Sequence, residues 1–246
     1  MRRREAGVTL IEVLVAVTLL SLLSLGMVMA IRVGLAAYSK TETKLMENRR
    51  VAGAQRIVLS ELEGMVPAFV MCGANGTGAG GQRAVLFEGV PQSLWMVSTF
   101  SLQQGWRGQP QILQLYVIPG EDAGVRLVVN EIPYTGSVGA AQYCAGTTNI
   151  PNSISRLAQM IPLATTSQTF VLADKLAYCR FSYFAPAPGL YDPPAWQPVW
   201  LAKGWPLAVR IDMAPESADP SRLQPITVTA PLHIRRDPEK VYTDEY

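Results

Sequence analysis

One acidic side chain stands inside an apolar segment near the N-terminus. Glu12 follows Gly7 and a basic cluster, and the 19 residues 13–31 that come after it carry no charge. A carboxylate within an apolar segment of membrane length costs about 2.5–3.5 kcal/mol on insertion scales. Such a charge is tolerated near the end of the segment or where a partner neutralises it. Glu12 is therefore the first candidate for a functional ion pair.

Side chains that could support catalysis are sparse. His233 is the single histidine, so a serine or cysteine nucleophile would have no other histidine to serve as its base. The acidic pairs Glu121/Asp122 and Asp244/Glu245 lie in turn and tail contexts and are interpreted as solvated charge. They lack the alternating acidic oxygens of a calcium loop. We expect no enzymatic activity, no metal site and no cofactor.

The element that must position Glu12 is a helix of membrane length. Roughly 20 apolar residues at about 1.5 Å rise each span a hydrocarbon core about 30 Å thick. Arg2, Arg3 and Arg4 precede the segment with little opposing charge. A basic flank of this kind is retained in the cytoplasm. The rest of the chain is then delivered to the far side of the membrane.

Two common interpretations of this segment have difficulty with Glu12. A cleaved secretory signal would use Val28-Met29-Ala30 as its small-x-small cleavage site and release a periplasmic domain that begins near Ile31. An uncleaved signal anchor would keep the segment in the membrane. Both interpretations place a carboxylate in the apolar segment without giving it a partner.

Residues 7–12, with the sequence Gly-Val-Thr-Leu-Ile-Glu, resemble the processing site of type IV pilins and type II secretion pseudopilins. The resemblance implies that the prepilin peptidase cuts between Gly7 and Val8 on the cytoplasmic face and methylates the new N-terminus at Val8. Glu12 becomes the fifth residue of the mature protein and receives the N-terminal amine of a neighbouring subunit during assembly. Val8 stands where the family more often has an aromatic residue.

The charge balance gives no support for nucleic-acid binding. The chain has 21 Lys and Arg against 19 Asp and Glu, and removal of residues 1–7 leaves 18 of each. Nucleic-acid binding normally needs a basic face. We therefore expect protein and inner-membrane lipid as partners, and no nucleic acid.

Helical patterning continues beyond the membrane. No proline occurs in residues 32–66, and Gly64 and Pro67 mark a stop. We expect one helix over residues 8–65: residues 8–31 span the membrane, and 32–66 form a periplasmic amphipathic half that the domain of residues 67–246 covers. Glu61 and Glu63 are assigned to its polar surface. Its apolar face has spacings of three and four, at Val51, Ala54, Val58, Leu62 and Met65.

Short strands with turn signals between them follow the helix. The expected strands are residues 84–87, 94–100, 112–118, 125–132, 176–184, 207–213 and 226–234. Residues 120–124 are expected to join two of them as a hairpin loop. Close spacing favours antiparallel meanders, so the predicted fold class is α+β. Residues 135–169 are interpreted as a largely irregular excursion, with one further helix considered at 153–161.

Three cysteines outside the cytoplasm permit one disulfide, and sequence alone does not choose among the three pairings. Cys179 alternates with Phe181 and Tyr183 along an expected strand, which is typical of a buried apolar residue. Cys72 and Cys144 both lie in glycine-rich surroundings, and we favour them as the pair. None of the cysteine spacings indicates a zinc site.

Residues 185–206 combine six prolines with Trp196, Trp200 and Trp205. The prolines exclude a central strand, and the tryptophans argue against a solvated linker. One interpretation is a segment that folds back and caps the core. The other is a contact surface for another subunit, since tryptophan is common among interface anchors.

The order of features along the chain narrows the resemblance. The long helix is followed by Gly-Trp-Arg-Gly-Gln-Pro at residues 105–110, a strand pair, the Trp-rich segment and a strand after Trp205. This order is similar to the J class of minor pseudopilins in type II secretion systems, whereas the K class typically lacks the glutamate found here as Glu12. The resemblance implies a pilin-like fold in which the long helix packs on antiparallel sheet, usually two sheets.

The resemblance also implies a function and a location. The chain would be single-pass in the inner membrane, with its C-terminal domain in the periplasm. It would join a pseudopilus tip complex with pseudopilins of the I and K classes and with the major pseudopilin. A minor pilin of a type IV pilus is the alternative within the same class of proteins.

Overall fold

The structure is a computed structural model. It describes residues 9–73, 80–102, 106–121, 123–166, 169–187, 192–216, 225–234 and 236–240, with the side chains of 43–52 and 106–107 excepted. The chain divides into two compact units, Met1–Arg49 and Arg50–Tyr246. The leader of residues 1–7, with Gly7, and the following Val8 lie outside the described residues. The side chain of Val51, which is predicted on the apolar face of the helix, also lies outside the described residues.

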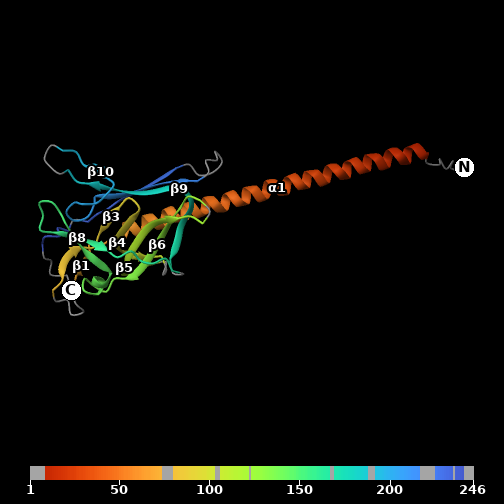
Figure 1. Cartoon of the computed structure of the whole chain (residues 1–246). Coiled ribbons are helices and arrows are strands. Elements are labelled where there is room, and N and C mark those ends of the chain that lie inside the picture. Colours follow the sequence, from red (N-terminus) through yellow and green to blue (C-terminus); the bar gives the residue numbers. More distant parts are fainter. Residues whose placement is uncertain are drawn as a thin grey trace. The chain divides into compact units, whose positions relative to one another are not determined.

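The helix α1 runs from Leu10 to Glu63 and contains 54 residues, so its residues belong to both units (Figure 1). In the first unit, every side chain from Leu10 to Glu42 is exposed. Among the described residues, this is the one helix that is long and apolar enough to cross a membrane. The predicted single long helix is confirmed.

The second unit contains a large, wholly antiparallel sheet with the strand order β12-β11-β9-β6-β5-β4-β3, and β10 pairs with β9. Figure 1 labels β3, β4, β5, β6, β9 and β10 of this sheet. Its strands are β3 (Glu88–Val90), β4 (Ser93–Ser101), β5 (Trp106–Pro119), β6 (Val125–Pro133), β9 (Phe170–Ala185), β10 (Ala195–Gln197), β11 (Ala208–Pro215) and β12 (Ile226–Pro231). The predicted hairpin joins β5 to β6, where the Gly120 amide donates to the Gly124 carbonyl at 3.0 Å.

A smaller sheet has the order β1-β2-β8-β7. Its strands are β1 (Phe69–Cys72), β2 (Gln82–Val85), β7 (Cys144–Asn149) and β8 (Arg156–Met160), and the 3-10 helix η1 (Gly139–Tyr143) precedes β7. β2 and β8 run parallel and meet at the pair Val85 and Leu157, while the other pairings are antiparallel. The expectation of antiparallel meanders holds for the large sheet and misses this parallel pair.

Strand alternation divides the second unit into two hydrophobic cores. Leu94 and Met96 of β4 point into a core that also contains Val58 and Leu62 from the end of α1. The neighbouring residue Trp95 points to the opposite face. The large sheet is therefore covered by the end of α1 on one face.

The second core lies between the large and small sheets. Trp95 and Val97 of β4 pack there with Val70 of β1, Ala84 of β2 and Met160 of β8. These side chains are all buried. The α+β fold with a long helix and two sheets agrees with the class predicted from the sequence.

Three local predictions are wrong. Residues 153–161 contain the strand β8, because pairing with β7 decides between helix and strand for a short apolar run. Residues 135–169 also hold η1 and β7, so they are less irregular than expected. Glu61 is buried in the core, not on the polar surface of α1.

Candidate assembly site

The described chain begins at Thr9, which caps α1. The Glu12 amide donates to the Thr9 carbonyl at 3.0 Å, and Thr9 Oγ1 lies 3.4 Å from the same nitrogen. Glu12 therefore stands in the first helical turn, where the helix dipole favours a negative charge. Its side chain is exposed and has no ion-pair partner within the described part of the chain.

The apolar surface of α1 in the first unit is open to other molecules. Large apolar side chains from Leu10 to Val33 are between about half and almost fully exposed. The hydroxyls of Thr18 and Ser21 donate back to the carbonyls of Val15 and Val17, at 2.9 and 2.8 Å. Their polar groups are thereby satisfied within the helix, as a lipid or helix-bundle environment requires.

A disulfide joins Cys72 of β1 to Cys144 of β7, which is the pairing that the sequence favoured. Cys179 is free and buried in the core of the large sheet. Burial is the main reason that the pKa of its thiol rises to about 12. This thiol is therefore unreactive at neutral pH.

Two of the three tryptophans proposed as contact residues are core residues instead. Trp200 is 2% exposed and Trp205 is 7% exposed. The Trp200 amide donates to the Gly89 carbonyl at 2.8 Å, and its ring nitrogen donates to the Gly204 carbonyl at 2.9 Å. Trp205 packs edge-on against Phe69. The contact prediction is wrong for these two residues, because the segment folds back and caps the core.

Trp196 of β10 differs from the other two. It is partly exposed and lies beside Phe184 of β9, with ring centroids 5.0 Å apart. The guanidinium of Arg210 on β11 lies 4.5 Å from the Trp196 ring centre. This aromatic and cationic group could not be assembled from sequence, because strand pairing brings its members together.

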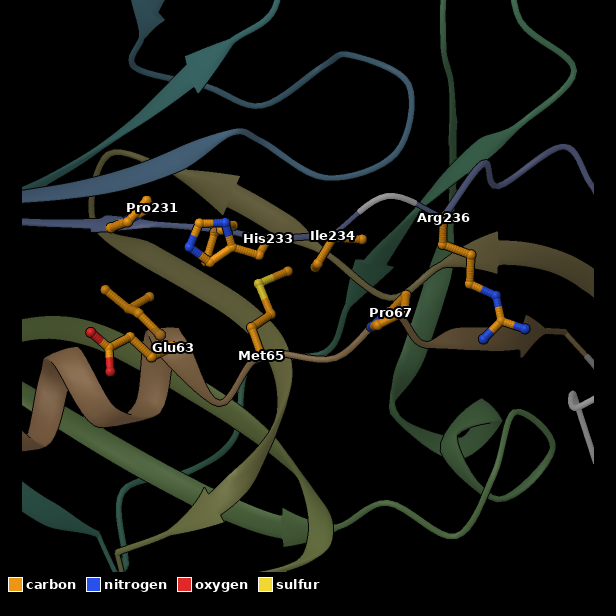
Figure 2. Close-up of a pocket in the computed structure, with 9 residues that line it drawn as sticks. Glu63, Met65, Pro67, Pro231, His233, Ile234 and Arg236 are labelled. Carbon is orange, nitrogen blue, oxygen red and sulfur yellow. The ribbon is translucent and has the colours of Figure 1, made fainter.

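A pocket of about 440 Å³ lies between the end of α1 and the chain after β12 (Figure 2). Figure 2 shows the Met65 side chain directed towards the segment that carries His233 and Ile234. Most of the lining is apolar, with Glu63, His233 and Arg236 as its charged or titratable members. No serine or cysteine is among the described residues that line it.

Comparison with known families identifies the N-terminal segment. Residues 2–28 match the prokaryotic N-terminal methylation motif, a prepilin-type signal. This match supports a type IV pilin-like protein, a pilin or a pseudopilin, that is processed by prepilin peptidase and assembles with other pilins. An N-terminal apolar helix with such a motif fits membrane anchoring. No curated protein matches the chain.

Proposed function

We propose that this chain is a minor pseudopilin of a type II secretion system, of the J class, and a structural subunit of the pseudopilus tip complex. In that role it supports export of folded proteins across the outer membrane. The observation that carries the proposal is a methylation motif leading into one long helix, whose end is packed in a two-sheet domain. Two sheets are usual for the J class.

The proposed mechanism is packing, with no catalytic step. The exposed apolar surface of α1 would bundle with neighbouring helices, and Glu12 would receive the amine of an adjacent subunit. The β-rich domain would dock on pseudopilins of the I and K classes and on the major pseudopilin. The protein would be single-pass in the inner membrane, with its domain in the periplasm, where a Cys72–Cys144 disulfide is expected to persist.

A minor pilin of a type IV pilus is the second candidate. The methylation motif of residues 2–28 favours it as well, because both kinds of subunit are processed in the same way. A single deletion strain separates the two functions. We expect loss of proteins exported by type II secretion from the culture medium, with surface pili unchanged and secretion restored by the wild-type gene. Loss of pili with normal secretion would favour the minor pilin, and loss of neither would contradict both.

A further inference from the structure

A carboxyl group lies in the core near the end of α1. Glu61 is 0% exposed, and neither of its carboxyl oxygens accepts a hydrogen bond from a donor. A carboxylate buried in this way loses its hydration without compensation. The neutral, protonated form of Glu61 is therefore favoured in the folded protein.

The surroundings of Glu61 contain a second carboxyl group. Glu61 faces Ser98 of β4 and Glu131 of β6. Glu131 is held in place, because its Oε1 accepts the Leu102 amide at 2.5 Å and its Oε2 accepts the Ser101 hydroxyl at 2.9 Å.

The described side chains of β5, the strand between β4 and β6, are uncharged, and the side chain of Arg107 on this strand lies outside the described residues. Leu113 of β5 is directly opposite Glu131 and belongs to the same core as the end of α1. Glu131 is the charged group that acts on Glu61 among the described residues. Two carboxyl groups that share a site in low dielectric do not both ionise readily.

Burial, together with the negative charge of Glu131, raises the pKa of Glu61 from its ordinary value of 4.5 to about 9. The Ser98 hydroxyl, which lies near the carboxyl group without a well-formed hydrogen bond to it, opposes this with a smaller effect. When the end of α1 is released, Glu61 regains the lower pKa and loses its proton at a lower pH. The stabilisation linked to Glu61 is therefore complete below about pH 4.5 and is lost progressively as the pH rises to about 9.

We propose that Glu61 and Glu131 share one proton, and that this pair is a proton-dependent latch holding the end of α1 against the large sheet. Glu61 carries the proton and donates it in a hydrogen bond, and the Glu131 carboxylate accepts. The latch lies within the second unit, so it does not depend on which filament the chain enters.

The chain directly after Glu61 shows what the latch controls. The Thr99 amide donates to the Gly64 carbonyl, and the Val66 amide donates to the Val97 carbonyl, both at 2.9 Å. A methyl group at Gly64 would approach the Ser98 hydroxyl to 2.6 Å, so the helix end and β4 are in close contact. Loss of the shared proton places two negative charges here, and movement of Glu61 towards water breaks these hydrogen bonds first.

Amide hydrogen exchange tests the latch on the full-length protein in detergent micelles between pH 6 and pH 9. The reporters are the amides of Val66 and Thr99, with rates corrected for base-catalysed intrinsic exchange. In the wild type, the opening equilibrium should increase by about tenfold for each pH unit. The variant Glu61→Gln keeps a neutral donor opposite Glu131 and should abolish this dependence.

The exposed neighbour Glu63 provides the matched control, and Glu63→Gln should keep the wild-type pH dependence. If Glu61→Gln retains that dependence, the latch does not exist.

Glu131→Gln gives a second measurement that does not require the first variant to fold. Removal of its charge should lower the pH at which the Glu61 carboxyl titrates in carbon-detected NMR, and an unchanged titration would contradict a shared proton. If added calcium slows exchange of the Val66 and Thr99 amides in the wild type but not in Glu61→Gln, the two carboxylates bind a cation and do not share a proton.

Discussion

Cys72 at the end of β1 is joined by a disulfide to Cys144 at the start of β7, with the two Cα atoms 5.4 Å apart. β1 and β7 are the two outer strands of the small sheet, so the bridge connects the sheet's opposite edges. The cysteines are 72 positions apart in sequence, and a link across such a loop removes much conformational freedom from the unfolded chain.

The double variant Cys72→Ser/Cys144→Ser should lower the free energy of unfolding by about 2–4 kcal/mol, because the unfolded chain regains that freedom. Urea unfolding followed by circular dichroism measures the change. Reductant should lower the free energy of unfolding of the wild type to the same extent and leave that of the double variant unchanged. Cys179→Ala is the matched control, since this buried thiol lies outside the bridge and the variant should keep the response to reductant. Equal midpoints for the wild type and the double variant would contradict a stabilising bridge.

The Trp-rich segment yields a prediction in which two neighbouring tryptophans behave differently. Trp200→Ala should destabilise the protein by about 3–5 kcal/mol, because it removes a buried ring beside Phe87 and the hydrogen bond to Gly204. Trp196→Ala removes a partly exposed ring and should cost about 1 kcal/mol. Urea unfolding of both variants provides the comparison. A larger cost for Trp196 would contradict the assignment of Trp200 to the core.

Strands whose own residues alternate between apolar and polar side chains could be predicted from the sequence. The alternation of Val209, Ile211 and Met213 with charged residues indicates a half-buried strand, and the structure has β11 there. The strand β8 was missed because its stability depends on pairing with β7, a relationship that single-segment periodicity does not contain. The group of Trp196, Phe184 and Arg210 is likewise created by strand pairing.

The burial of Glu61 was missed for a different reason. Its position three residues after Val58 and four before Met65 places it within the apolar stripe of the helix. Glutamate is almost always exposed, and that general preference opposes what the spacing indicates. Glu131, which faces Glu61 in the structure, is 70 positions away along the chain, so no sequence pattern connects the two.

Processing at Gly7 yields a prediction about covalent structure. The protein recovered from membranes of its own host should start at Val8 and carry one added methyl group. Intact-mass analysis of the purified protein measures both changes. Gly7→Val should leave residues 1–7 attached, because the resemblance places the cut directly after this glycine. A wild-type chain that starts near Ile31 would instead identify a cleaved secretory signal, with the domain released into the periplasm.

Glu12→Ala should impair incorporation into filaments while leaving the cut after Gly7 intact. In the described chain Glu12 is exposed in the first turn of α1 without an ion-pair partner, and in a filament it would meet the amine of the next subunit. Removal of one member of a buried ion pair costs about 3–5 kcal/mol, which corresponds to about a hundredfold or more in the assembly equilibrium.

The measurement compares the amount of each variant in sheared filament fractions with the amount in membranes, after intact mass has established processing. Glu12→Gln is the matched control for size, since it keeps the length of the side chain and removes the charge. If charge pairing is the reason for the defect, Glu12→Gln should be impaired almost as strongly as Glu12→Ala. Normal incorporation of both variants would show that no amine pairs with Glu12. The carboxylate would then only interact favourably with the positive end of the helix dipole, next to Thr9.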